Sequence, residues 1–219
     1  MTPEAFAQEY ECSFDAAVKG AYYGKDIEIA DSEGRICNVS YDKSADVFAA
    51  WDLGMGDMTS IWFGQIVGRE YHWIGYYENN GQGLDHYVEY IKSLRFPVHL
   101  HYLPHDAEAR ELQTGNSRIQ FLEGRGFNCR IVPRHNVDDG INAVRVKLNR
   151  MWFDKTNCGK GIDCLRMYRA EFDEKNMVLK SRPLHDWASH GADAFRYGVM
   201  GAEEPRKTET VLPIRSWVA

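Results

Sequence analysis

Strand-like patterns dominate the middle of the chain. Residues 47–52 are an apolar run, and residues 60–67 and 71–78 are rich in β-branched and aromatic side chains. Gly68 and Arg69 form a tight turn between the second and third of these runs. Because short turns join antiparallel neighbours, we predict three consecutive antiparallel strands.

Helical and strand-like patterns alternate in the next fifty residues. Apolar residues recur at the spacing of one helix face, at Leu84, Tyr87, Val88, Ile91 and Leu94. Pro97 ends this predicted helix. The pattern then predicts a strand over residues 99–103, a helix over 117–123 and a strand over 127–132.

The last third of the chain is mainly helical in pattern. Ile141, Val144, Leu148 and Met151 mark one helix, and further helices are predicted over residues 163–172 and 186–199. The resulting order is β-β-β-α-β-α-β-α, with extra helical residues before the last helix. Since helical crossovers make strands parallel, we predict an α/β fold with a mixed five-stranded sheet flanked by helices. This is the element order of the ribonuclease H-like fold, in which the first and fourth strands are neighbours.

The two ends of the chain lack this pattern. Residues 1–46 show no strand alternation: residues 3–18 suit a helix, and residues 20–34 are rich in turn-forming residues. We therefore predict an N-terminal arm or linker over residues 1–46, a single domain over 47–200 and a C-terminal tail over 201–219.

Composition excludes several classes of protein. A chain of 219 residues with 44% hydrophobic residues is long enough for one substantial core, and no apolar run reaches the length of a membrane span. The segment after Met1 is polar and does not have the pattern of a signal peptide. The five cysteines include no CxxC pair, so reduced thiols in a cytosolic compartment are expected.

Charge is unevenly distributed along the chain. Residues 1–117 hold 8 Lys and Arg against 19 Asp and Glu, whereas residues 118–182 hold 14 against 8. The basic stretch suggests a phosphate-facing surface beside an acidic metal site, with ordinary solvated helix faces as the alternative. Arg145, Lys147 and Arg150, on the helix after Gly140, are the leading candidates for contacts with DNA phosphates.

Carboxylates stand at the ends of the strands expected to be neighbours. Asp52 ends the first strand, and Asp106 follows the fourth. Asp186, His190 and Asp193 are spaced to share one face of the last helix. Clustered carboxylates repel one another unless a divalent cation compensates their charge, and all-oxygen ligation favours Mg²⁺ or Mn²⁺. Two such ions would support hydrolysis of a phosphodiester bond.

Each of these residues also has a purely structural interpretation. Asp52 and Asp106 each suit a turn or a helix cap, and Asp57 suits either a metal site or a loop turn. Asp186 is the expected N-cap of the last helix, so Asp193 is the preferred ligand on that helix. His185 and His190 are expected to be surface or capping residues rather than ligands.

Several motifs together resemble one family. Residues 50–60 (AWDLGMGDMTS), 103–107 (LPHDA), 139–145 (DGINAVR) and, most specifically, 185–197 (HDWASHGADAFRY) resemble the nuclease domain of tailed-phage terminase large subunits. Residues 6–15 (FAQEYECSFD) resemble the segment that leaves the ATPase domain of these proteins. The likeness spans most of the chain.

The resemblance implies a function. Asp52, Asp106 and Asp193 match the family's catalytic, metal-binding carboxylates, and Asp57 is a possible further ligand. The implied activity is a Mg²⁺- or Mn²⁺-dependent endonuclease that uses two metal ions to cut double-stranded viral DNA when genome packaging begins and ends, in the cytoplasm of the host cell. The implied partners are the ATPase domain, the portal and the small terminase subunit; the chain holds no G-x-x-x-x-G-K-[ST] phosphate loop of its own.

Two other functions remain open at this point. A Holliday-junction resolvase or a transposase-like nuclease would use the same fold and the same carboxylates. A DNA-packaging adaptor without enzymatic activity would carry an acidic cluster that is merely solvated.

Overall fold

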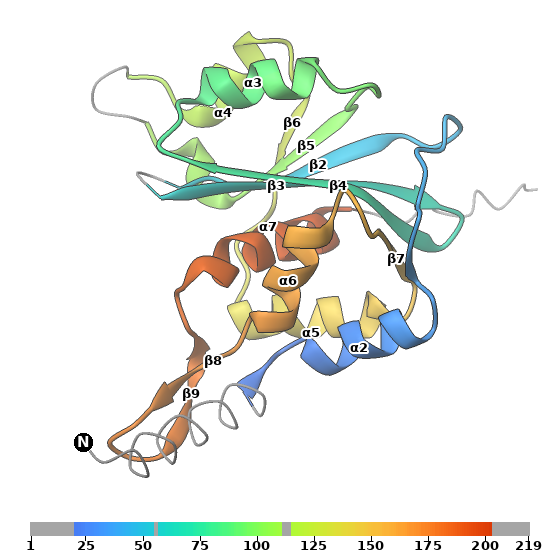
Figure 1. Ribbon diagram of the computed structural model, residues 1–219. Coiled ribbons are helices and arrows are strands. Elements are labelled where there is room, and N and C mark those ends of the chain that lie inside the picture. The colour runs from blue at the N-terminus through green and yellow to red at the C-terminus, as the bar shows by residue number, and fades with distance from the viewer. Residues whose placement is uncertain (1–19, 55–56, 111–114, 203–219) are drawn as a thin grey trace, which may run out of the picture.

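A seven-stranded mixed sheet forms the centre of the molecule (Figure 1). The structure is a computed structural model, and it describes residues 20–54, 57–110 and 115–202. The strands lie in the order β1-β7-β4-β3-β2-β5-β6. Their bounds are Ile36–Cys37 (β1), Val47–Asp52 (β2), Met58–Val67 (β3), Glu70–Asn80 (β4), Leu100–Leu103 (β5), Cys129–Ile131 (β6) and Met151–Asp154 (β7).

The five predicted strands are confirmed as β2 to β6. β2, β3 and β4 form the antiparallel meander, and Gly68 adopts a positive φ of 64° in the turn between β3 and β4. β5 pairs in parallel with β2, so the first and fourth predicted strands are neighbours as expected. β6 continues the sheet in parallel beyond β5. The C-terminal ends of β2 and β5 therefore lie at the same edge of the sheet.

The sheet contains two strands that the pattern does not predict. Residues 141–151 are predicted as one helix, but α5 covers only Val137–Leu148, and Met151 begins β7. β7 pairs in parallel with β4 on one side and with the two-residue β1 on the other. Met151 fits the helical spacing of α5 only by coincidence, because its buried side chain packs into the same core as α5 but from a strand.

Residues 20–46 are more ordered than a turn-rich segment. α2 covers Gly24–Ser32, and its buried residues Ile27 and Ala30, with the preceding Tyr23, join the main hydrophobic core. β1 then adds an edge to the sheet. The division of the chain at residues 46 and 200 stays a prediction. Three other predictions lie outside the described residues: the helix over residues 3–18, the resemblance of residues 6–15 and residues 203–219 of the tail.

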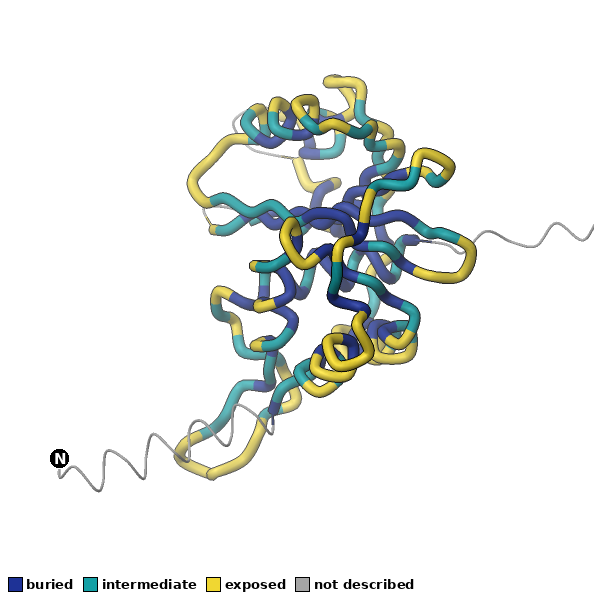
Figure 2. The backbone as a smooth tube through the Cα atoms, turned by 45° about the vertical axis from the view of Figure 1, so that its right-hand side comes forward, coloured by how far each residue is buried: buried dark blue, intermediate teal, exposed yellow. Residues whose placement is uncertain are grey.

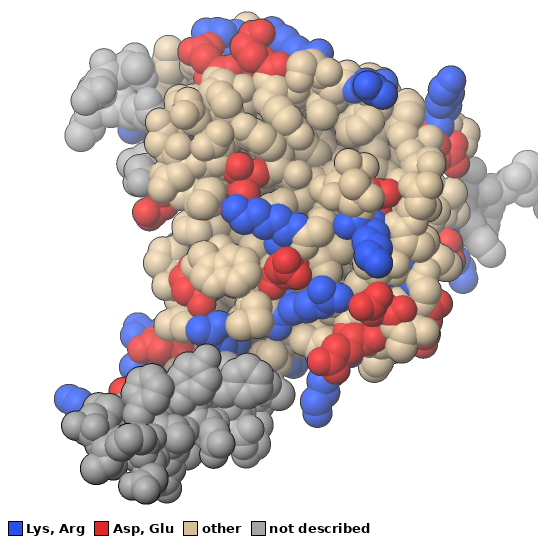
Figure 3. Space-filling model, viewed as in Figure 1, with Lys and Arg blue, Asp and Glu red and all other residues tan. Residues whose placement is uncertain are grey.

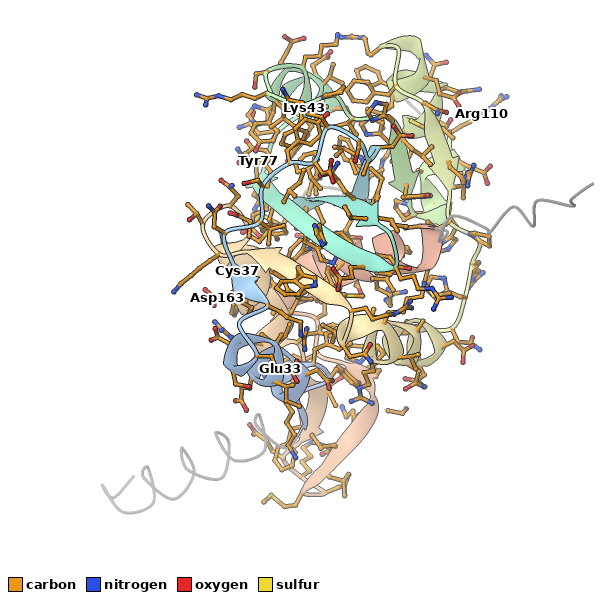
Figure 4. The ribbon with its side chains drawn as sticks, turned by 90° about the vertical axis from the view of Figure 1, so that its right-hand side faces the viewer. Glu33, Cys37, Lys43, Tyr77, Arg110 and Asp163 are labelled. Atoms are coloured by element: carbon orange, nitrogen blue, oxygen red, sulfur yellow. The ribbon has the colours of Figure 1, made fainter. Side chains whose placement is uncertain are left out.

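Helices cover both faces of the sheet. α3 (Leu84–Lys92) and α4 (Arg118–Gly124) lie on one face, while α2, α5, α6 (Gly159–Met167) and α7 (Trp187–Gly201) lie on the other (Figure 1). Figure 2 shows the buried residues concentrated in the central strands and in the helix segments that face them. Figure 4 shows Tyr77 on the α3 side, where it stacks on Tyr90, and Glu33 at the end of α2 on the opposite side.

A β-hairpin projects from the side of the molecule that holds α2, α5, α6 and α7. A helix is predicted over residues 163–172, but α6 ends at Met167 and the chain continues into β8 (Ala170–Asp173). β8 pairs with β9 (Val178–Pro183), and the hairpin returns the chain to the start of α7 (Figure 1). Among the described residues, no helix is long and apolar enough to cross a membrane.

Candidate active site

Polar residues form a row across three strands at one end of the sheet. Asp52 ends β2 and lies opposite Ser60 of β3, which in turn lies opposite Glu78 of β4. Residues directly opposite one another point to the same face of a sheet. In this protein that face is covered by α6 and α7, so the row lies between the sheet and these helices.

α7 approaches the row closely because its inner face is made of small residues. A Cβ atom on Gly191 would lie 2.8 Å from the hydroxyl of Tyr76, and one on Gly198 would lie 2.8 Å from Cβ of Ala50. The indole of Trp62 also donates a hydrogen bond of 2.8 Å to the carbonyl oxygen of Gly191. α7 is thereby held against β2, β3 and β4.

The beginning of α7 is fixed by the predicted cap. The Asp186 side chain accepts a hydrogen bond of 3.0 Å from the backbone N–H of Ala188, which confirms Asp186 as the N-cap. Asp186 also pairs with Arg169 at 3.3 Å. Because both interactions engage this carboxylate, Asp186 serves the start of the helix.

His190 joins α7 to the end of β2. Its Nδ1 lies 3.0 Å from Oδ2 of Asp52, and its side chain is only 14% exposed. The hydrogen bond with Asp52 raises the pKa of His190, and the charges of Asp57 and Asp193 add to this effect. The expectation that His190 is a surface or capping residue is therefore wrong. The signal was its spacing from Asp186 and Asp193 on one helix face.

Of the three predicted carboxylates, Asp106 and Asp193 each lie within electrostatic range of Asp52. Burial raises the pKa of Asp52; its hydrogen bond with His190 lowers that pKa, while the negative charges of Asp193 and Asp106 raise it further. Asp106 lies in the short helix η1 (His105–Glu108) directly after β5, and its side chain is exposed. Asp193 lies two turns into α7, with its side chain 29% exposed. Asp57, just before β3, is exposed, and its negative charge acts on His190.

These residues suit a hard divalent cation by their chemistry. Carboxylate oxygens are the ligands that Mg²⁺ and Mn²⁺ prefer, and a cation would offset the burial and the repulsion that together raise the pKa of Asp52. Within the described residues, no three His, Cys, Asp or Glu side chains are grouped closely enough to hold a metal ion as they stand. A metal site at these carboxylates would require rotation of the side chains of Asp52, Asp106 or Asp193.

A second polar cluster lies at the Glu78 end of the row. The hydroxyl of Tyr76 donates to Glu78 and lies 3.2 Å from Oγ of Ser60. Glu78 has a side chain only 5% exposed and forms an ion pair with Lys160 at the start of α6. Lys160 itself is 63% exposed. It therefore presents positive charge to solvent at the same end of the sheet as Asp52.

The three residues predicted to contact phosphates each donate to a backbone carbonyl oxygen, and Arg150 lies at the opposite end of β4 from Glu78. Arg145 donates to the carbonyl oxygen of Tyr22 at 2.9 Å, Lys147 to that of Val199 at 2.9 Å and Arg150 to that of Arg69 at 3.4 Å. Arg69 precedes β4, whereas Glu78 is near its end, so about 9 residues or roughly 30 Å of strand separate the two ends. On the face in Figure 3, basic and acidic side chains are interspersed. DNA binding by these three residues stays a prediction.

Neither a protein-family model nor a curated protein matches the sequence. Solved structures do share its fold. The large terminase of a thermophilic bacteriophage matches with a TM-score of 0.63 at 17% identity, over 82% of this chain and 44% of that one. The P22 large terminase nuclease domain matches with a TM-score of 0.58 at 17% identity, over 77% of this chain and 88% of that one. The large terminase nuclease from phage G20c with bound cobalt matches with a TM-score of 0.53 at 15% identity, over 82% and 97%.

The extent of these matches defines which part of a terminase the chain resembles. The chain spans less than half the length of the first of these large terminases, but most of the length of the P22 and G20c nuclease domains. The predicted ribonuclease H-like architecture is confirmed, with two more strands than expected. The chain therefore has the fold of the nuclease domains of phage large terminases.

Proposed function

We propose that this chain is a divalent-metal-dependent endonuclease that hydrolyses phosphodiester bonds in double-stranded DNA. The observation that carries the proposal is the convergence of Asp52, Asp106 and Asp193 from β2, η1 and α7. They are close enough that the charges of Asp193 and Asp106 add to burial in raising the pKa of Asp52. This convergence occurs in a fold shared with large terminase nucleases, one of which is described with bound cobalt.

Asp52, Asp106 and Asp193 are the proposed ligands of two Mg²⁺ or Mn²⁺ ions, with Asp57 as a further candidate. When bound, such ions supply an activated water and compensate the charge of the scissile phosphate. Asp52 provides the half-buried anchor of the site at the end of β2. His190 holds Oδ2 of Asp52 at 3.0 Å and thereby orients the carboxylate before an ion arrives. Asp106 is exposed after β5, and its charge acts on Asp52, so it is the proposed ligand on the solvent side.

The wider role proposed for the chain is cutting viral DNA at the start and end of genome packaging, in the cytoplasm of the host cell. In this role it would work with an ATPase domain, a portal and a small terminase subunit. The proposal is supported by the match to a phage large terminase of which this chain corresponds to less than half.

The test is a plasmid cleavage assay. With Mg²⁺ or Mn²⁺, the protein should nick and linearise supercoiled plasmid with little sequence preference, and EDTA should abolish the reaction. Cleavage should also be lost in Asp52→Asn and Asp106→Asn, with both variants folded by circular dichroism. A wild-type protein that neither cuts DNA nor binds Mn²⁺ would support the adaptor function instead.

A second assay separates the proposed nuclease from a junction resolvase. A packaging nuclease should cut a linear duplex and a four-way junction of the same sequence at similar rates. Strong preference for the junction would favour the resolvase. Transposase-like activity would instead appear as joining of cut ends to a second DNA molecule.

A further inference from the structure

Asp193 is held by two donors that both contact the same oxygen. Arg196, one turn further along α7, donates from Nη2 to Oδ1 at 2.8 Å. The hydroxyl of Tyr168, at the end of α6, donates to the same Oδ1 at 3.3 Å. Within the described part of the chain, both contacts of this carboxylate go to Oδ1 and none goes to Oδ2. The carboxylate is thus anchored by one oxygen while the other is left for a ligand.

The two donors are buried and supported from behind. Tyr168 is 1% exposed and Arg196 is 4% exposed. The ring of Tyr23 stacks on that of Tyr168 with 5.7 Å between centroids. α5 packs directly on the aliphatic part of the Arg196 side chain: a Cβ atom on Gly140 would lie 2.5 Å from Cδ of Arg196 and 2.8 Å from Nε2 of His135. A side chain at position 140 would displace Arg196.

His135 fixes the other end of the guanidinium. Its Nδ1 lies 3.0 Å from the carbonyl oxygen of Pro133, which can only accept, so Nδ1 carries the proton. Its Nε2 lies 2.7 Å from Nη1 of Arg196, which can only donate, so Nε2 carries the lone pair. Arg196 therefore donates on both sides, from Nη1 to a neutral His135 and from Nη2 to Asp193.

We propose that Tyr168, Arg196 and His135 are positioning residues that orient the Asp193 carboxylate so that Oδ2 alone binds a divalent metal ion. This inference rests on the proposed function, because it assumes that Asp193 is a metal ligand. Residues that hold a metal ligand by hydrogen bonds commonly change metal affinity by about 10- to 100-fold when they are mutated. In this proposal the three residues act through Asp193 and not by contact with the DNA or the ion.

Tyr168→Phe tests the proposal, with Tyr23→Phe as the matched control. Both changes remove one buried hydroxyl from the same stacked pair, but the Tyr23 hydroxyl has no hydrogen-bond partner among the described residues. Mn²⁺ binding is measured by isothermal titration calorimetry without DNA. We expect Tyr168→Phe to raise the Kd for Mn²⁺ about tenfold and Tyr23→Phe to leave it unchanged.

The metal dependence of cleavage gives a second readout. In Tyr168→Phe, the Mn²⁺ concentration for half-maximal plasmid cleavage should rise about tenfold, while the rate at saturating Mn²⁺ stays near that of the wild type. Arg196→Lys keeps the charge but loses the simultaneous contact with His135 and Asp193. It should raise this Mn²⁺ concentration further. Wild-type Mn²⁺ affinity in Tyr168→Phe, or an equal loss in Tyr23→Phe, would overturn the proposal. A wild-type protein that binds no Mn²⁺ would instead overturn the proposed nuclease and this inference together.

Discussion

Nδ1 of His190 lies 3.0 Å from Oδ2 of Asp52, and this contact connects the first turn of α7 with the end of β2. The imidazole is the partner of a half-buried carboxylate on which the charges of Asp193 and Asp106 also act. When His190 is protonated, it compensates the charge of Asp52. When it is neutral, Asp52 stands beside Asp106 and Asp193 without that compensation.

The stability of the metal-free protein should therefore depend on pH through His190. Its hydrogen bond with Asp52 raises its pKa above the ordinary 6.5. A group whose pKa is raised by folding contributes stability that is complete below the unfolded-state pKa and is lost as pH rises through the folded-state pKa. We expect the Tm in EDTA to fall as the pH rises above about 6.5, and His190→Gln to reduce this fall.

His185→Gln is the control for this measurement. His185 immediately precedes the N-cap of α7, and its ring packs against that of His190 with 5.1 Å between centroids, but it contacts Oγ of Ser189 at 3.1 Å rather than a carboxylate. Its replacement should leave the pH dependence of the Tm as in the wild type. An identical slope in His190→Gln and the wild type would show that the contact with Asp52 does not couple stability to pH.

A second pH effect is expected from His101, away from the carboxylates. Burial lowers the pKa of His101 to about 4, and the indole of Trp51 donates to its Nδ1 at 3.2 Å. Because the folded-state pKa is lowered, the stabilisation is present above about 6.5 and is lost as pH falls towards 4, by up to about 3 kcal/mol. Urea unfolding at several pH values should show less acid destabilisation in His101→Gln than in the wild type. Equal acid sensitivity of the two proteins would contradict this origin.

The elements that the sequence predicts are those with a repeated local pattern. β2 is an apolar run, β3 and β4 are rich in β-branched and aromatic residues, and α3 buries Tyr87, Val88 and Ile91 on one face as expected. Periodicity reports which side of an element faces the core. It cannot separate a helix from a short strand that continues its spacing, which explains the error at Met151 of β7.

The site was predictable only in part for a related reason. Asp52 and Asp106 stand at the ends of neighbouring strands, so topology alone brings them together. The contacts of His190, Tyr168 and Arg196 depend on how α6 and α7 pack against the sheet. A polar side chain at a helical spacing does not reveal which residue it will meet across an interface between elements.

The position of bound DNA can be tested with one lysine variant and one arginine variant. Lys160 is exposed at the Asp52 end of the sheet, whereas Arg150 contacts the carbonyl oxygen of Arg69 at the other end. Lys160→Gln removes the charge but keeps a donor for Glu78. If duplex DNA lies over the carboxylates, Lys160→Gln should weaken its binding and reduce the slope of log K against log salt by about 1, whereas Arg150→Gln should change neither.

The opposite result would support the predicted contacts of Arg145, Lys147 and Arg150. In that case, reversing these three charges together should weaken DNA binding and flatten its salt dependence, while Lys160→Gln binds as the wild type does. Fluorescence anisotropy with a labelled duplex at several salt concentrations, in EDTA to prevent cleavage, distinguishes the two surfaces. Melting temperatures of all variants identify any that fail to fold.

The last prediction separates the two acidic residues of α7. Asp186 caps the helix through the N–H of Ala188, so Asp186→Ala should cost about 1 kcal/mol of stability and leave much of the cleavage activity. Asp193→Asn should abolish nearly all cleavage, because it removes the charge of a proposed metal ligand without changing the volume of the side chain. It should also lower the Tm, because the buried Arg196 loses its ion pair with Asp193. Plasmid cleavage and melting temperature, each with and without Mn²⁺, decide between the roles. An active Asp193→Asn together with an inactive but folded Asp186→Ala would mean that Asp186, not Asp193, is the metal ligand. In that case, Mn²⁺ should stabilise Asp193→Asn as much as it stabilises the wild type.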